Sequence, residues 1–245
     1  MHNGIHYEPL LVVLSYVISV LGSYTALQLA IAIPQARDRL AALGWTIGAA
    51  TALGGGAIWS MHFIAMNAAD MGMPVTYDAG LTFASLVMGI VASAIGLYVV
   101  GRGEGSTAKL LISGVVTGLG VALMHYTGMA AMLMAAKIDY DPTLFYASLV
   151  IAVVAAAVAL WLAFNLRGNL QRFGSAIVMG IAVCGMHYTG MYAVKMTPAA
   201  EPAATGISLP PATLGQSVFI VSAVVLVLLL AFSAWKSQRS VMADL

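Results

Sequence analysis

Long apolar runs separated by short polar connectors make up most of this sequence. Seven runs approach or exceed the roughly 20 residues that an α-helix needs to cross a bilayer, and none contains Asp, Glu, Lys or Arg in its interior. The runs cover residues 10–33, 43–69, 80–100, 110–136, 143–164, 175–194 and 214–235. This pattern predicts an all-α membrane protein with seven transmembrane helices.

A twelve-residue pattern recurs in three of these runs. Its copies are GGAIWSMHFIAM at 55–66, GLGVALMHYTGM at 118–129 and GIAVCGMHYTGM at 180–191. Their histidines, His62, His125 and His187, lie 63 and 62 residues apart. Because every copy falls on an even-numbered helix, we expect three repeated helical hairpins, at about 10–69, 80–136 and 143–194, and a separate seventh helix at 214–235. Together they form a single membrane domain over residues 1–245.

Positive charge is unevenly divided between the two sets of connectors. One side and the C-terminal tail hold Arg37, Arg39, Arg102, Lys109, Arg167, Arg172, Lys236 and Arg239, and the other side holds Lys137 and Lys195. The positive-inside rule therefore predicts an outer N-terminus and a cytoplasmic C-terminus. At about 1.5 Å per residue, the three histidines then lie in the outer half of the bilayer, at a similar level.

A shorter repeat precedes the first, third and fifth helices: Tyr7-Glu8, Tyr77-Asp78 and Tyr140-Asp141. A carboxylate at a helix start is ordinary N-cap chemistry, and tyrosine is common at the membrane interface. We therefore expect capping carboxylates and interfacial tyrosines with a structural role.

Composition agrees with a membrane protein. The chain of 245 residues is 61% hydrophobic and 8% charged, whereas soluble domains are about 25% charged. A net charge of +1 gives no reason to expect binding to nucleic acid, and the single cysteine, Cys184, excludes a disulfide within the chain. The expected partner of most of the surface is the lipid bilayer.

The repeated histidines suggest one shared site. An imidazole within a bilayer is costly unless it has a partner, and three at equivalent positions are expected to converge. A methionine follows each histidine by four residues, on the same helix face: Met66, Met129 and Met191. Imidazole with thioether suits copper, especially Cu(I), whereas zinc more often takes a carboxylate or thiolate. Haem remains an alternative because two facing histidines can ligate iron.

Other motif residues have both a functional and a structural interpretation. Met61, Met124 and Met186 directly precede the histidines and are further candidate ligands or packing residues. Cys184 is either an extra ligand or a small buried residue. Tyr126 and Tyr188 are candidate hydrogen-bond donors beside the site, although the first copy has Phe63 instead. Small residues that allow close helix packing recur at Gly55, Gly118, Gly180, Gly128 and Gly190.

The strings MHYT at 124–127 and 186–189, with MHFI at 61–64, resemble the bacterial MHYT family of integral membrane sensors. The resemblance implies copper held near the outer face of the inner membrane by His62, Met66, His125, Met129, His187 and Met191. It also implies sensing of a diatomic gas such as oxygen, carbon monoxide or nitric oxide. Only ten residues follow Trp235, so we expect either a stand-alone unit with output through a cytoplasmic signalling partner or the sensor part of a longer protein.

Two other functions are alternatives to a copper sensor that responds to a gas, redox or copper signal. A copper-dependent membrane oxidoreductase would use the same histidines, but no carboxylate general base lies near the motif. A copper transporter or binding protein is the second alternative, although coupled carriers usually have intramembrane carboxylates or lysines. We therefore expect a sensor rather than an enzyme.

Overall fold

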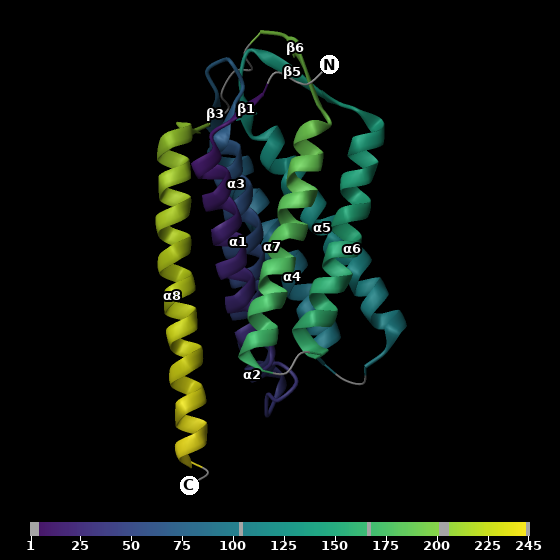
Figure 1. Ribbon diagram of the computed structural model, residues 1–245, viewed down its shortest axis with the longest axis vertical. Coiled ribbons are helices and arrows are strands. Elements are labelled where there is room, and N and C mark those ends of the chain that lie inside the picture. Colours follow the sequence, from purple (N-terminus) through teal and green to yellow (C-terminus); the bar gives the residue numbers. More distant parts are fainter. Residues whose placement is uncertain (1–4, 103–104, 166–167, 201–205, 244–245) are drawn as a thin grey trace.

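The residues that the structure describes form seven helices long and apolar enough to span a membrane, as predicted (Figure 1). The computed structural model describes residues 5–102, 105–165, 168–200 and 206–243. The second span consists of α2 (Arg39–Ala50), η1 (Thr51–Trp59) and α3 (Ser60–Ala68), which run on as one helix and are called helix 2 below. The other spans are α1 (Pro9–Ala30), α4 (Ala79–Gly101), α5 (Thr107–Ala130), α6 (Pro142–Asn165), α7 (Asn169–Tyr192) and α8 (Pro211–Ala243). The fold class is confirmed.

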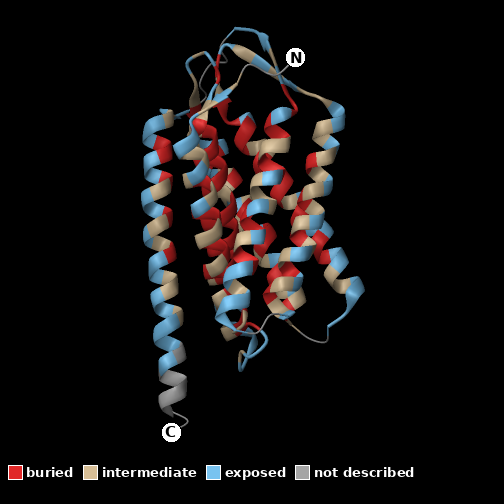
Figure 2. Cartoon of the chain, viewed as in Figure 1, coloured by how far each residue is buried: buried red, intermediate tan, exposed pale blue. Residues whose placement is uncertain are grey.

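The first six spans form a closed ring, and α8 lies outside it. The ring runs through α1, helix 2, α4, α5, α6 and α7, and α7 packs back onto α1. α8 packs against α1 and helix 2 and extends beyond the bundle at its C-terminal end (Figure 1). Buried residues gather inside the ring, and the outward faces of the helices are largely exposed (Figure 2). Those faces are apolar, as expected for helices surrounded by lipid.

The first helix of each hairpin, α1, α4 or α6, starts at its predicted capping carboxylate. Glu8, Asp78 and Asp141 each accept a hydrogen bond from a backbone N–H two or three residues later, at 2.7, 2.8 and 3.0 Å. Lys195 also binds the carboxylate of Asp141 at 2.9 Å, and this hydrogen bond is the main reason that the pKa of Asp141 lies below its usual value. The three repeats therefore begin in the same way.

Short antiparallel strands join the two ends of each hairpin, and the sequence did not predict them. The pairs are β1 (His6–Tyr7) with β2 (Ala69–Asp70), β3 (Thr76–Asp78) with β4 (Met132–Leu133), and β5 (Ala136–Tyr140) with β6 (Val194–Pro198). β7 (Ser208–Leu209) adds to β3. Because α5 ends at Ala130, the predicted helix over 110–136 is too long. Strands of two to five residues are too short to show a clear alternation of polar and apolar positions.

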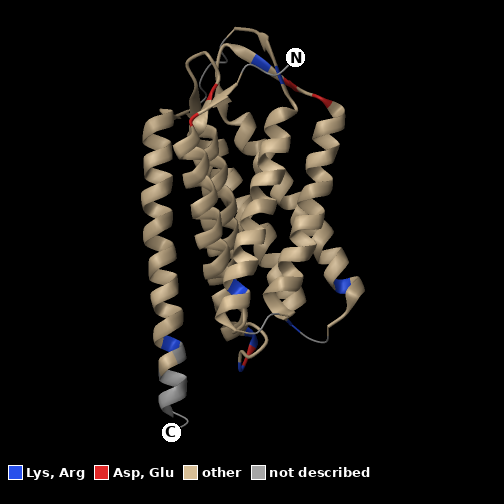
Figure 3. Cartoon of the chain, viewed as in Figure 1, with Lys and Arg blue, Asp and Glu red and all other residues tan. Residues whose placement is uncertain are grey.

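Charges differ between the two ends of the bundle (Figure 3). At the end that carries the strands, called the strand end below, the described charged residues are Lys137, Lys195 and five carboxylates: Glu8, Asp70, Asp78, Asp139 and Asp141. The described basic residues of the opposite end are Arg37, Arg39, Arg102, Lys109, Arg172 and Lys236. Arg167 and the side chain of Arg239 lie outside the described residues. The described charges therefore keep the asymmetry expected from the sequence.

A π-helix in the first repeat changes which glycine makes the closest helix contact. η1 interrupts helix 2, whereas α5 and α7 are α-helical throughout. A Cβ on Gly118 would lie 2.5 Å from Val153 Cα, and one on Gly180 would lie 2.7 Å from Val20 Cγ2. At Gly55 the nearest atoms are side-chain carbons at 3.5 Å, an ordinary contact, whereas a Cβ on Gly54 would lie 2.2 Å from the carbonyl oxygen of Gly89. The predicted packing role of Gly55 is thus corrected to Gly54, because the wider π-turns shift the register by one residue.

This difference predicts unequal effects of two neighbouring substitutions. Gly54→Ala should lower the free energy of unfolding by about 1–3 kcal/mol, because the new methyl group overlaps backbone that cannot move away easily. Gly55→Ala should leave it unchanged or raise it slightly, because the site has room and alanine favours a helix. Thermal unfolding in detergent, followed by circular dichroism, measures both. Equal melting temperatures would contradict the register shift.

Candidate metal centre

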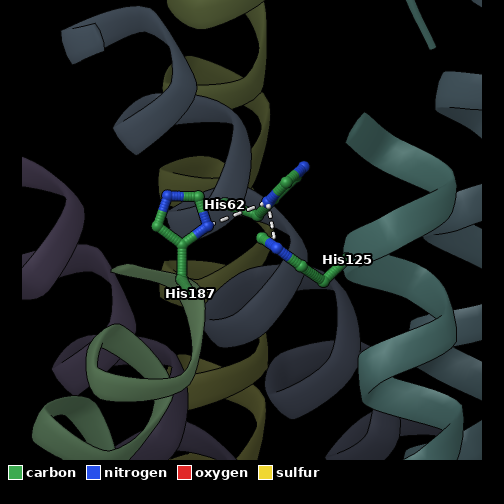
Figure 4. A group of neighbouring side chains, drawn as sticks. All are labelled: His62, His125 and His187. Atoms are coloured by element: carbon green, nitrogen blue, oxygen red, sulfur yellow. Dashed lines mark hydrogen bonds between the residues drawn. The ribbon is translucent and has the colours of Figure 1, made fainter. Parts of the chain in front are cut away.

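The three motif histidines meet inside the ring of helices (Figure 4). His62 lies on α3, His125 on α5 and His187 on α7, and each is at most 1% exposed. The Nδ1 atom of His62 lies 3.0 Å from Nδ1 of His187 and 3.1 Å from Nδ1 of His125. Candidate ligand atoms of all three lie within 4.8 Å of one another. The predicted convergence of three hairpins on one place is therefore present in the fold.

The three imidazole rings stand edge to face. Their centroids are 4.9, 5.0 and 5.1 Å apart, with interplanar angles of 80°, 78° and 88°. The Nδ1 contacts place one nitrogen of each ring toward the middle of the cluster (Figure 4). The other nitrogen, Nε2, is buried in each ring and has no hydrogen-bond partner in the part of the chain that the structure describes.

Two motif glycines make room for the Nε2 edges of the rings. A Cβ on Gly128 would lie 2.4 Å from Nε2 of His62, and one on Gly190 would lie 2.5 Å from Nε2 of His125. Each glycine belongs to the repeat that follows the histidine it contacts. The sequence predicted these glycines to bring helices together, and the structure shows that they also accommodate an imidazole. The equivalent residue of the first repeat is Ala65, which is fully buried.

The cluster has the properties of a site for a cation. A neutral imidazole carries one N–H, so three Nδ1 atoms facing one another cannot all be satisfied by protons, and a buried unsatisfied polar group costs about 1–3 kcal/mol. Nitrogens bound to one metal ion at about 2.0 Å lie about 3.3–3.5 Å apart. The observed separations of 3.0 and 3.1 Å are close to this value. Small movements of the rings would therefore suffice to hold a metal ion.

The motif methionines are all buried, and they differ in their surroundings. Met66, Met129 and Met191 lie one helical turn from the histidines, toward the strand end. In contrast, Met124 packs against Gly89 of α4, and Met186 lines an apolar cavity. Met61 is buried in the same core. Packing against neighbouring residues accounts for Met124 and Met186 without a role as ligands.

The remaining candidates do not join the histidines. Among the described His, Cys, Asp and Glu residues, the three histidines alone form a group able to hold a metal, so Cys184 is not placed as an extra ligand. It is half-buried and free. The hydroxyl of Tyr126 hydrogen-bonds to Ser148 of α6 at 2.7 Å, and its ring packs edge-on against His125. Tyr188 packs in the same way against His187.

An aromatic layer covers the strand side of the cluster, and sequence reasoning missed it. The tyrosine before the first helix of each hairpin packs against the aromatic residue that follows a histidine of the neighbouring repeat in the ring. The pairs, with their centroid distances, are Tyr7–Tyr188 (5.5 Å), Tyr77–Phe63 (5.7 Å) and Tyr140–Tyr126 (5.1 Å). Tyr77 is only 3% exposed, which contradicts its predicted interfacial position. Burial raises the pKa of Tyr140 to about 12.

In the first repeat, Trp59 makes the polar contact that Phe63 cannot make because it has no hydroxyl. Ser148, six residues after the start of α6, is the partner of Tyr126. Ser85, six residues after the start of α4, instead accepts a hydrogen bond from Nε1 of Trp59 at 3.0 Å. The tryptophan lies one turn before Phe63 on helix 2. The polar contact between an even-numbered span and the next odd-numbered span is therefore retained.

Fold and site together define a seven-helix membrane protein with a buried three-histidine centre built from three repeats. The family model MHYT, described as a bacterial signalling protein N-terminal repeat, matches residues 1–43, 55–113, 118–176 and 180–243. The chain therefore belongs to the MHYT family of bacterial signalling proteins. No solved structure matches it.

Three similar proteins are much longer than this chain. The bifunctional diguanylate cyclase/cyclic di-GMP phosphodiesterase MucR of Pseudomonas aeruginosa is 41% identical over 95% of this chain and 34% of its own length. The signaling protein YkoW of Bacillus subtilis is 36% identical over 79% of this chain and 25% of its own length. The cyclic di-GMP phosphodiesterase NbdA of P. aeruginosa is 36% identical over 80% and 26%. The chain thus spans about a third or less of these relatives.

The glycine contacts yield a prediction about metal affinity. Gly128→Ala should weaken Cu(I) binding at least tenfold, because its methyl group displaces the His62 ring without removing any candidate ligand. Gly185→Ala is the matched control, because a Cβ there would meet nothing within 4 Å. Competition with a chromophoric Cu(I) chelator measures the two affinities, and circular dichroism verifies folding. Equal affinities in the two folded variants would show that the glycine does not orient the ring.

Proposed function

We propose that this chain is a membrane sensor that holds copper at the three-histidine cluster and passes a redox- or ligand-dependent change to a cytoplasmic signalling partner. One observation carries the proposal: three buried imidazoles present their Nδ1 atoms to one another, two of the separations being 3.0 and 3.1 Å. Membership of a signalling family supports the sensory role. The names of two relatives suggest that the output is connected with cyclic di-GMP.

The set of donor atoms favours copper over zinc and over haem. The residues that would hold it are His62, His125 and His187, with the buried thioethers of Met66, Met129 and Met191 one turn away. When bound, copper supplies a change of oxidation state and an exchangeable position for a diatomic gas such as oxygen, carbon monoxide or nitric oxide. Zinc is less suited because no carboxylate or thiolate of the described residues joins the cluster. Haem is less suited because its macrocycle does not fit between nitrogens 3.0–3.1 Å apart.

The surrounding residues suit reversible binding better than catalysis or transport. Gly128 and Gly190 leave room for two of the rings, and aromatic residues pack together on the strand side. An oxidoreductase would need a group that moves protons, but no carboxylate of the described residues lies in the cluster. A coupled transporter would need charged side chains within the spans, whose apolar interiors contain none.

Contacts of α8 offer a route from the site to the opposite end. Ser222 of α8 hydrogen-bonds to Ser60, two residues before His62, at 2.5 Å. Leu226 of α8 packs on Gly56, where a Cβ would lie 2.7 Å from Leu226 Cδ2. A displacement of His62 would therefore move α8 through these contacts. α8 extends past the other helices at its C-terminal end (Figure 1). A cytoplasmic partner bound near that end could detect the change.

Charge asymmetry supports an orientation in the bacterial inner membrane with the N-terminus outside and the C-terminus in the cytoplasm. In a Cys184→Ser background, Lys137→Cys at the strand end should react with a membrane-impermeant maleimide in spheroplasts. Arg37→Cys at the opposite end should react only after lysis. Both native side chains are exposed, at 69% and 90%. The reverse labelling pattern would invert the proposed orientation.

Removal of one imidazole tests the metal site directly. His125→Ala should lower Cu(I) affinity more than tenfold, because the cluster loses one of three nitrogen donors, whereas the folded protein should still insert into the membrane. Met124→Leu is the control, because this methionine packs against Gly89 and a swap of similar volume is tolerated. Copper content is measured by mass spectrometry after purification. Equal copper in wild type and His125→Ala would remove this histidine from the site.

A further inference from the structure

An apolar cavity of about 50 Å³ lies next to the histidine cluster, on the side away from the strand end. Ile58, Val121 and Val183 line it, and each stands four residues, about one helical turn, before a motif histidine. Thr117 and Met179, eight residues before His125 and His187, line it one turn further on. The cavity is thus built from the same three even-numbered spans that carry the histidines.

Alanines of α6 form the remaining wall. Ala152 and Ala156 stand ten and fourteen residues after the start of α6. Fourteen residues after the start of α1 and of α4, the chain has Ser23 and Ser93, which are buried. At this position the third repeat therefore presents a methyl group where the other two present a hydroxyl. The methyl group of Ala156 adds to the apolar lining of the cavity.

The cavity has no free polar group to hold water. The hydroxyl of Thr117 is the polar side-chain group in the lining, and it is a hydrogen-bond donor to the carbonyl oxygen of Ala92 at 3.3 Å. A buried water needs two to four polar partners, whereas cavities lined by apolar side chains stay dry and bind apolar molecules. An occupant of this cavity must therefore be apolar.

Position and size restrict the occupant further. The cavity is partly open between α6 and α7, where Ala155, Ala159 and Ala182 are half-buried and the outward faces meet lipid. About 10–15 Å³ holds one water, and about 150 Å³ holds benzene. A volume of about 50 Å³ fits a diatomic gas or a xenon atom. Such molecules dissolve better in hydrocarbon than in water.

We infer that this cavity is a binding site for one small apolar molecule of diatomic size, which enters from the bilayer between α6 and α7. Binding in the cavity requires no metal. A role of the cavity in sensing rests on the proposed function. In that role the bound molecule would lie one helical turn from the histidines.

Molecular oxygen is the probe, and metal-free protein in lipid nanodiscs is the sample. Oxygen is paramagnetic, so it shortens the relaxation times of nearby nuclei. The side chains of Met179 and Met186 line the cavity, whereas the equally buried Met61 and Met124 do not. In protein labelled with ¹³C at the methionine methyl groups, oxygen pressure should enhance relaxation at Met179 and Met186 at least threefold more than at Met61 and Met124. Equal enhancement at all four would overturn the site.

Two variants and a second probe separate the alternatives. Ala156→Leu fills the cavity and should abolish the excess enhancement, whereas Val154→Phe adds bulk on the exposed face of the same helix and should retain it. If Ala156→Leu does not fold, Ala152→Val replaces it. A nitroxide at the end of a lipid acyl chain that broadens Met186 more than Met61 would show a lipid tail in the cavity and overturn the proposal. If His125→Ala loses copper binding but keeps the excess oxygen relaxation, the histidine is needed for copper and not for the cavity, and the inference stands.

Discussion

Burial of three imidazoles inside an apolar bundle is the constraint on which the rest of this structure depends. Within a bilayer no water is available to satisfy a polar side chain, so the rings of His62, His125 and His187 must find their partners in one another or in a bound cation. They can do so only if one helix of each hairpin approaches the interior of the ring. The closed ring, the small residues beside the histidines and the common starts of the three hairpins all serve this approach.

Contacts at the centre link each repeat to the next. The Nε2 edge of His62 rests against Gly128, and that of His125 rests against Gly190, so the following hairpin provides the space for a ring. In the same direction, Tyr77 covers Phe63, and Tyr140 covers Tyr126. Because no hairpin completes its own part of the site, the centre exists only when all three are assembled. This arrangement makes the cluster sensitive to any relative movement of the hairpins.

The first repeat departs from the threefold pattern at the point where α8 packs. It contains the π-helix, and the glycines of that π-helix contact α4 and α8. It also has Phe63 in place of a tyrosine, with Trp59 as the donor to Ser85. In a fully symmetric bundle, a change at the centre would move all three hairpins alike. A single output helix can follow such a change only if it packs against one hairpin that differs from the others. The hydrogen bond between Ser60 and Ser222 connects that repeat to α8.

The sequence by itself determined the seven spans, the three hairpins, the level of the histidines and the capping carboxylates, because each depends on residues close together in the chain. It did not determine which nitrogens face one another, that Tyr77 is buried, that Gly54 rather than Gly55 touches α4, or that Cys184 lies outside the cluster. Nor did it reveal the short strands or the cavity. These features depend on contacts between hairpins about 60 residues apart, and spacing along one helix indicates only the face on which a side chain lies. Its neighbours across the ring decide what it meets there.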